Sequence, residues 1–198
     1  MARISIPMQI TPVDQDNNLF FIKDVFPQGL VDQIISTDWL ALPWRRQEGQ
    51  ESWPRRRIEN QALTWNSEWD DCCRELWPTI GKSTGFEVLG YQSSSTNGYG
   101  TAWWVDEPGF TCAMHTDGEM PGAVQMTWIG NANLGTSFYH YKNSDALRHQ
   151  FVVNPNTGYI MINQLQPEGY RKLQWHAMLN PVPQSQFRVS SYSWITAL

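Results

Sequence analysis

The sequence predicts a mainly β protein of one domain, with supporting helices on one face. Three observations lead to this fold class. The length of 198 residues suits a single domain. Short aromatic and β-branched segments recur through the second half of the chain, and clusters of Gly, Pro and Asn separate them. We therefore treat 1–198 as one domain, with a supporting part at 1–85 and a β-rich core at 86–198.

The supporting part reads as mixed α and β. A strand is expected at 18–26, followed by a short helix at about 27–38 that begins on a proline, which suits the first helical turn. A second helix is expected from about Ser67, because Ser67 and Asp70 resemble a capping box. Pro78 should kink or shorten this helix, because proline lacks the backbone N–H that a helix interior needs.

The core contains nine short segments that favour strands. Turn signals such as Glu-Pro-Gly and Asn-Pro-Asn-Thr-Gly lie between them. Many short, evenly spaced strands are typical of a sandwich or a jelly roll rather than of an alternating βαβ protein. The expected strands are 86–95, 99–105, 110–115, 123–129, 136–142, 149–153, 158–163, 173–179 and 186–196.

Composition excludes several classes of protein. The chain has 14 basic and 19 acidic residues and a net charge of -5, which disfavours a nucleic-acid partner. No apolar run is long enough to span a bilayer, and residues 1–18 lack the apolar stretch of a signal peptide. The three cysteines suggest no disulfide framework, so we expect a cytoplasmic protein. No pattern indicates an oligomeric state.

The segment 42–61 stands out because it is polar and rich in arginine. Arg45, Arg46 and 55–57 place five positive charges in an otherwise acidic chain. We expect a mobile loop here. Its charges are interpreted in two ways, as a solvated face or as a lid that meets an acidic or peptide substrate.

Two of the four histidines lie in informative surroundings. His115 ends an expected strand, and Asp117 follows at the second position along, on the same face of extended backbone. His176 lies on another expected strand. Two histidines and one carboxylate form the facial triad of non-haem Fe(II) oxygenases, which leaves metal positions open for co-substrate and oxygen.

Arg188 lies in the last expected strand, where Arg188, Ser190, Tyr192 and Trp194 share one face. An arginine that points inward needs a partner. A planar guanidinium with a hydroxyl two residues further on suits a carboxylate, which arginine binds with two parallel hydrogen bonds.

These pieces together resemble the 2-oxoglutarate/Fe(II)-dependent dioxygenases. The order is His-x-Asp, a gap of about 60 residues, a histidine, and Arg-x-Ser about 12 residues later. The stretch WHAMLNPVPQSQFRVSSYSW is similar to the terminal part of that family, and NLFFIKDVFPQGLVDQII is similar to the start of its prolyl-hydroxylase-like branch. GTSFYHY stands where the family often has a Gly-Gly strand, a departure from the pattern.

The resemblance implies a double-stranded β-helix, that is, a cupin-like jelly roll. It implies that His115, Asp117 and His176 bind Fe(II), and that Arg188 and Ser190 bind the distal carboxylate of 2-oxoglutarate. The implied reaction hydroxylates a C–H bond with O2 and releases succinate and CO2. The substrate would be a peptidyl residue, a free amino acid or another small metabolite. Tyr91 and Tyr99 are candidates for an additional 2-oxoglutarate contact.

Two other functions compete with this interpretation. The same triad suits a zinc hydrolase or an isomerase on a cupin-like barrel. A carbohydrate-binding jelly roll without catalysis would instead use exposed tryptophans. The 11 tryptophans bear on this choice: we expect one group (Trp39, Trp69 and Trp77) to dock the helices, and another to form a dry shell near the metal (Trp103, Trp104, Trp128, Trp175 and Trp194).

Overall fold

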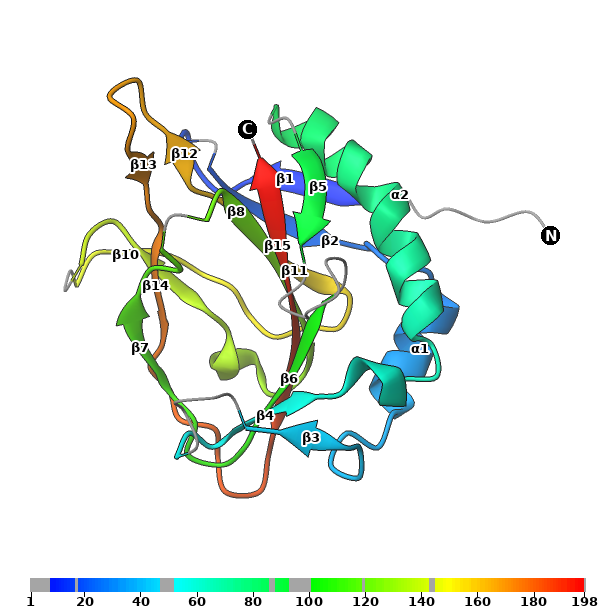
Figure 1. Ribbon diagram of the computed structural model, residues 1–198. Helices are drawn as coiled ribbons and strands as arrows, with labels where there is room; N and C mark the ends of the chain where they lie inside the picture. Colours follow the sequence, from blue (N-terminus) through cyan, green and yellow to red (C-terminus); the bar gives the residue numbers. More distant parts are fainter. Residues whose placement is uncertain are drawn as a thin grey trace.

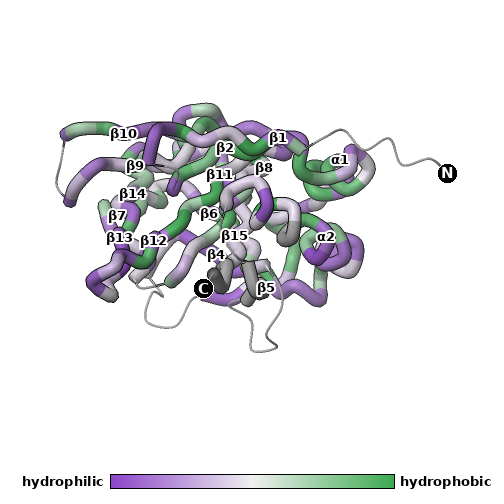
Figure 2. The backbone as a smooth tube through the Cα atoms, turned by 90° about the horizontal axis from the view of Figure 1, so that it is seen from above, coloured by the Kyte–Doolittle hydropathy of each residue, from purple (hydrophilic) through white to green (hydrophobic). Residues whose placement is uncertain are grey.

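The chain folds into two β-sheets and a helical layer. A computed structural model describes residues 8–16, 18–46, 52–85, 88–92, 101–118, 120–142 and 145–197. Figure 1 shows the major sheet between the helices and a smaller sheet on its other side. The view from above in Figure 2 shows the same three layers, with a hydrophobic central strand β11 and hydrophilic residues on α2. None of the described helices is long and apolar enough to cross a membrane.

The major sheet has the strand order β1-β2-β11-β8-β15-β6-β4-β3, and β5 pairs with β15 outside this path. All of its pairings are antiparallel. The strands are β1 (Gln9–Pro12), β2 (Leu19–Lys23), β3 (Trp44–Arg45), β4 (Arg55–Ile58), β5 (Val88–Gln92), β6 (Ala102–Asp106), β8 (Gly122–Ile129), β11 (Thr157–Ile162) and β15 (Arg188–Ala197).

The minor sheet has the order β10-β9-β14-β7 and carries the two histidines singled out above. Its strands are β7 (Cys112–His115), β9 (Ser137–Tyr139), β10 (Leu147–Gln150) and β14 (Trp175–Met178). The remaining elements are the β12–β13 pair (Gln164–Leu165 and Arg171–Lys172), two helices, α1 (Gln28–Ser36) and α2 (Asn66–Thr84), and two short 3-10 turns (Asn60–Ala62 and Ala132–Leu134).

The structure confirms the predicted β-rich core and both helices. Each of the nine expected segments overlaps a strand, and the helices start within one residue of their expected positions. The expected boundary at residue 85 does not separate two layers of the structure. Strands from both sides of it pair within the major sheet, β2 with β11 and β4 with β6.

Two expectations for α2 differ from the structure: Pro78 does not shorten the helix, and the expected capping box does not form. The helix continues through Pro78 to Thr84, where Gly85 ends it in a left-handed conformation (φ 74°). The predicted capping box is absent, because Asn66 is the first helical residue and the preceding Trp65 makes no side-chain capping bond. The Asp70 carboxylate instead accepts a hydrogen bond from the Asn66 side chain within the helix.

The expected mobile loop at 42–61 contains two strands. β3 and β4 form a hairpin, and β4 pairs with β6, so this segment extends the major sheet. Three arginines of the hairpin are paired with carboxylates of β6 and the residue after it: Arg55 with Asp106, and Arg46 and Arg56 with Glu107. These three arginines therefore do not form a solvated face. Residues 47–51 of the segment lie outside the described ranges.

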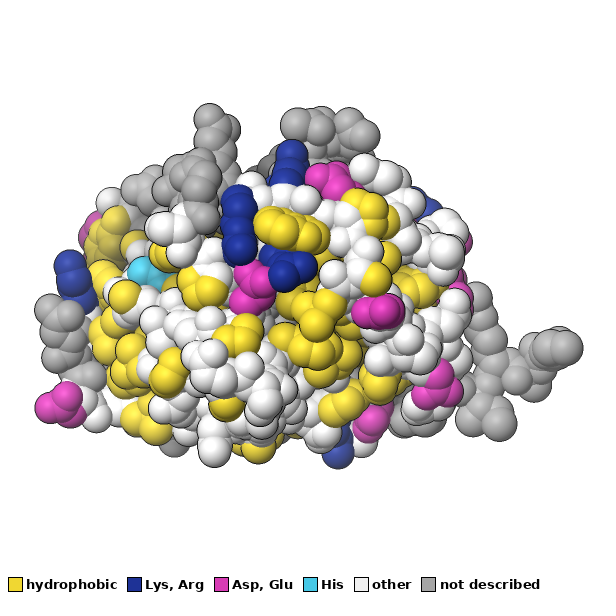
Figure 3. Space-filling view, turned by 90° about the horizontal axis from the view of Figure 1, so that it is seen from below, with side chains coloured by type: hydrophobic (Ala, Val, Ile, Leu, Met, Phe, Trp, Pro, Cys, Tyr) yellow, Lys and Arg dark blue, Asp and Glu magenta, His cyan; other side chains and the backbone are white. Residues whose placement is uncertain are grey.

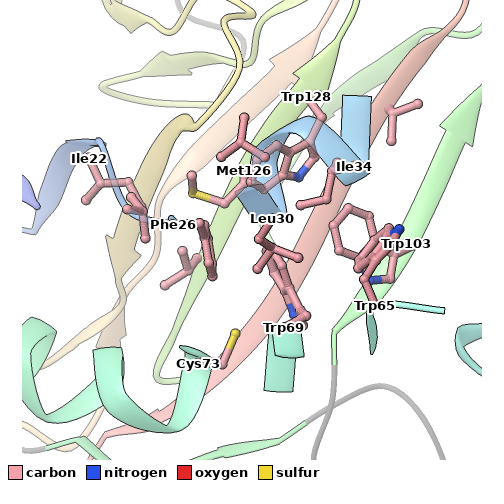
Figure 4. Close-up of a cluster of buried hydrophobic side chains, with 14 of the residues drawn as sticks. Ile22, Phe26, Leu30, Ile34, Trp65, Trp69, Cys73, Trp103, Met126 and Trp128 are labelled. Carbon is pink, nitrogen blue, oxygen red and sulfur yellow. The ribbon is translucent and has the colours of Figure 1, made fainter. Parts of the chain in front are cut away.

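The largest hydrophobic core lies between the major sheet and the helices (Figure 4). Trp103 of β6 is fully buried at its centre. Its ring centroid lies 4.7 Å from that of Trp69 on α2 and 5.3 Å from that of Trp39, which follows α1. Trp39 and Trp69 thus dock the helices as predicted. Trp103 and Trp128 belong to this same core, so the prediction that they form the metal shell was wrong.

Replacing Trp103 with alanine tests this description of the core. We expect a loss of about 3–5 kcal/mol in the free energy of unfolding, because a large side chain is removed from a packed site. Tyr141 is 72% exposed, so Tyr141→Ala is the control and should change stability by less than about 0.5 kcal/mol. Urea denaturation measures both values, and equal effects of the two substitutions would contradict the assignment.

Candidate metal centre and carboxylate site

The minor sheet brings the two histidines together. His115 of β7 and His176 of β14 are cross-strand partners, and their ring centroids lie 4.4 Å apart. Asp117 follows β7 in a turn where Gly118 adopts a left-handed conformation (φ 73°). The Asp117 carboxylate lies against both histidines, so the predicted His-x-Asp motif and the distant histidine meet in space.

The geometry of these three side chains fits one metal ion. Asp117 Oδ1 lies 3.4 Å from His115 Nε2 and 3.6 Å from His176 Nε2. One ligand atom from each of the three residues lies within 4.8 Å of the others. Two ligand atoms about 2.1 Å from a shared metal are themselves roughly 3–3.5 Å apart. Small adjustments would therefore complete a set of two histidines and one carboxylate.

Backbone carbonyls orient both imidazole rings for this role. His115 Nδ1 lies 2.8 Å from the Ala113 carbonyl oxygen, and His176 Nδ1 lies 3.0 Å from that of Gln174. Because a carbonyl oxygen only accepts, each Nδ1 donates and carries the hydrogen. The other nitrogen, Nε2, is then the one that can bind a metal, and in both rings it faces Asp117.

The histidines favour the ionised form of Asp117. The hydrogen bond with Asp117 raises the pKa of His115 to about 10. Burial by itself raises the pKa of Asp117, but hydrogen bonds from His115 and His176 outweigh it and hold that pKa well below its ordinary range. Asp117 is thus ionised, as a metal ligand must be, and metal binding displaces a proton from His115.

Tyr192 connects this centre to the major sheet. Its hydroxyl, on β15, donates a hydrogen bond to Asp117 Oδ2, the carboxylate oxygen that does not face the histidines. Burial raises the pKa of Tyr192 well above its ordinary value, so the phenol keeps its proton for this bond. A partner that holds the outer oxygen of a ligating carboxylate fixes its orientation.

The major sheet has a polar inner face opposite its tryptophan-rich outer face. Alternate residues of β15, Val189 among them, point into the helical core, while Arg188, Ser190 and Tyr192 share the inner face as predicted. Buried residues of the neighbouring strands continue this face in register. Most are polar (Asp106 of β6, Gln125 and Thr127 of β8, and Thr157 of β11), and two are aromatic (Trp104 of β6 and Tyr159 of β11).

One buried group on this face lacks a partner. Among the described residues, Ser190 Oγ is fully buried and makes no hydrogen bond. An unsatisfied buried hydroxyl costs about 1–3 kcal/mol. Its position beside Arg188 on the same strand face therefore suits an acceptor supplied by a ligand.

Arg188 is 2% exposed and is held by two protein acceptors. Its Nε donates to Asp106 Oδ2 at 2.7 Å, and its Nη1 donates to the Leu134 carbonyl oxygen at 2.9 Å. The expectation that this buried arginine is paired is confirmed. Gly130 lies against its stem, where an added Cβ would be 3.4 Å from Arg188 Cγ.

Several residues of the site escaped the sequence analysis. Asp106 was given no role, although a carboxylate that alternates with Trp104 along an apolar strand was a visible signal. Arg55 was interpreted as part of a solvated face or a substrate lid, not as a partner of Asp106. Tyr159 and Tyr192 are the tyrosines that the structure places on the inner face. The proposed Tyr99 lies outside the described residues, as does the side chain of Tyr91.

Comparison with solved structures identifies the fold. No protein-family model matches the sequence, and no curated protein is similar to it in sequence. A viral collagen prolyl hydroxylase from Paramecium Bursaria Chlorella virus-1, in complex with 2OG, superposes with a TM-score of 0.54 at 13% identity, covering 91% of this chain and 96% of its own. A truncated form gives 0.55 at the same identity, with 91% and 90% covered. A Shewanella oneidensis protein described as a candidate oxygenase gives 0.58 at 12% identity, with 94% and 85% covered.

The chain therefore has the jelly-roll fold that 2OG-Fe(II) oxygenases share, as the sequence predicted. At 12–13% identity, this likeness establishes the fold. The chemistry has to be argued from the site itself.

Removing a triad side chain tests the metal centre directly. Asp117→Ala and His176→Ala should each weaken Mn(II) binding by more than about 100-fold, because the loss of an outer partner alone costs about 10–100-fold. Isothermal titration with Mn(II) at neutral pH gives the affinities. His149→Ala is the matched control and should bind Mn(II) like the unsubstituted protein. Full Mn(II) binding by either triad variant would contradict the assignment.

The Asp106 pair predicts a pH dependence of stability. Burial raises the pKa of Asp106, but the charges of Arg55 and Arg188 outweigh it and hold this pKa below its ordinary value of 3.8. A folded-state pKa below the unfolded one stabilises the protein above about pH 4, and this contribution is lost as the pH falls through the folded value.

The unfolding free energies of the unsubstituted protein and Asp106→Asn should therefore differ most near neutral pH, by about 3–5 kcal/mol. The difference should shrink below about pH 4. Urea denaturation between pH 7 and pH 3 measures it, and the other carboxylates cancel because both proteins contain them. A difference that stays constant over this range would refute the pairing.

Proposed function

We propose that this chain is an Fe(II)- and 2-oxoglutarate-dependent oxygenase that hydroxylates a C–H bond. The observation that carries the proposal is the position of three ligating side chains opposite a strand that presents Arg188 and Ser190. The hydrogen bond from Tyr192 to Asp117 joins these two halves of the site. The fold shared with 2OG-Fe(II) oxygenases supports the same conclusion.

The chain's residues would divide the work as follows. His115, Asp117 and His176 would hold Fe(II). The bound iron supplies oxidation of the substrate with O2, coupled to conversion of 2-oxoglutarate into succinate and CO2. The protein binds and orients the reactants and excludes water.

A dicarboxylate fits the charge of the inner face. Two guanidinium groups, of Arg55 and Arg188, surround the single carboxylate of Asp106. This largely buried group retains one net positive charge, which an anionic ligand would neutralise. Ser190 Oγ supplies a further hydrogen-bond donor beside Arg188 on the same face. The distal carboxylate of 2-oxoglutarate would take this position.

The substrate is proposed as a peptidyl residue, with a free amino acid or another small metabolite as the other class. The relative named as a collagen prolyl hydroxylase supports the peptidyl class. It is also supported by the exposed aromatic side chains of the hairpin, because Trp44 and Trp53 are 40% and 36% exposed and aromatic surfaces suit peptide contacts.

Turnover tests this function. The Fe(II)-loaded protein should form succinate from 2-oxoglutarate under air, in the presence of proline-containing peptides or mixed amino acids, as measured by mass spectrometry. Arg188→Met should raise the KM for 2-oxoglutarate by at least about 100-fold, because it removes a bidentate charged partner.

Asp117→Ala should abolish succinate formation, and Arg74→Met, at an exposed position on α2, is the control expected to leave it unchanged. The proposal would be overturned if the Fe(II)-loaded protein formed no succinate and the Zn(II)-loaded protein acted as a hydrolase or isomerase. That result would favour the competing metalloenzyme.

A further inference from the structure

Three charged residues form a row across three neighbouring strands. In the register of the major sheet, Asp106 of β6 lies directly opposite Arg55 of β4 on one side and Arg188 of β15 on the other. The three side chains therefore share the inner face. Arg188 is thus linked through Asp106 to the arginine-rich hairpin, which is otherwise distant in sequence.

Asp106 is saturated by this arrangement. Its Oδ1 accepts from Arg55 Nε, and its Oδ2 accepts from Arg55 Nη2 at 3.2 Å and from Arg188 Nε at 2.7 Å. The carboxylate is fully buried. Arg55 is further fixed by its own packing, because its guanidinium lies 4.2 Å from the ring centroid of Phe110 and 5.1 Å from that of Trp104.

The row also determines which edge of Arg188 can meet a ligand. Arginine has five N–H groups, and among the described residues Arg188 uses one on Nε and one on Nη1. The side edge that includes Nε is occupied by Asp106. A ligand carboxylate would therefore be bound end-on, by the remaining N–H groups of Nη1 and Nη2.

We infer that Asp106 and Arg55 are positioning residues for co-substrate binding: Asp106 orients Arg188, and Arg55 offsets the charge of Asp106 so that Arg188 remains available to an anion. This inference rests on the proposed function. Without Arg55, the carboxylate of Asp106 would have Arg188 as its one cationic partner, and the net charge of the row would fall from positive to zero.

The adjacent residue of the hairpin provides a matched control. Arg56 lies on the opposite face of β4 and pairs with Glu107, with both side chains partly buried, and it also stacks on Trp44. The view from below in Figure 3, which faces the β3–β4 end of the molecule, shows basic side chains interleaved with acidic and hydrophobic ones. Arg55→Gln and Arg56→Gln therefore remove the same charge from adjacent positions, and only the first touches the row.

The experiment compares 2-oxoglutarate binding to the Mn(II)-loaded proteins by titration calorimetry. Arg55→Gln should weaken 2-oxoglutarate binding by at least about tenfold, with Mn(II) affinity unchanged. Its KM for 2-oxoglutarate should rise in proportion, while kcat changes little. Arg56→Gln should bind both ligands like the unsubstituted protein. Arg55→Lys keeps the charge but loses the two-point and stacked contacts of the guanidinium, so its loss of 2-oxoglutarate affinity should be smaller than that of Arg55→Gln.

The outcomes separate this inference from the proposed function. If the unsubstituted Mn(II)-loaded protein does not bind 2-oxoglutarate, the proposed function fails. If it binds and Arg55→Gln binds equally well, only the positioning role fails. Should Arg55→Gln lose Mn(II) binding through misfolding, Arg55→Lys decides, since a tenfold loss of 2-oxoglutarate affinity at unchanged Mn(II) affinity would contradict the charge argument.

Discussion

The alternation of side chains along β15 is the constraint on which the rest of the structure depends. One face of this strand contributes Val189 to the helical core, and Ser191 on that face accepts a hydrogen bond from the indole of Trp128. The other face presents Arg188, Ser190 and Tyr192 to the minor sheet. Because a shift of one residue would exchange the two faces, packing of the tryptophan core also fixes the register of the site.

This division explains why so aromatic a protein has so polar an interior. The helices bury the hydrophobic face of the major sheet, and their core supplies the apolar burial that stabilises the fold. The space between the two sheets can then hold charged and polar groups. Such groups are costly to bury without partners. In the row of Arg55, Asp106 and Arg188 the opposite charges are paired, and one positive charge is left for a ligand.

Much of the fold followed from local sequence patterns. Strand positions were predictable because aromatic and β-branched segments alternate with strong turn residues. The Arg-rich hairpin was not, because its strands are short and polar, and they are stabilised by long-range pairs with Asp106 and Glu107. The continuation of α2 past Pro78 likewise contradicted a rule based on local backbone chemistry.

Part of the site was also predictable from local sequence patterns. His115, Asp117, His176, Arg188 and Ser190 occur in an ordered pattern along the chain, which the resemblance to a family could recognise. Asp106 and Tyr192 act through cross-strand and inter-sheet contacts, and no spacing along the sequence shows these. Their roles emerged only when the sheet register was known.

If one dicarboxylate bridges the metal triad and Arg188, as the proposed function requires, metal binding and ligand binding must depend on each other. The affinity for 2-oxoglutarate should be measured by calorimetry with and without saturating Mn(II). Mn(II) should tighten 2-oxoglutarate binding by at least about tenfold, and 2-oxoglutarate should tighten Mn(II) binding by the same factor. Equal affinity for 2-oxoglutarate in the two states would contradict the bridging arrangement.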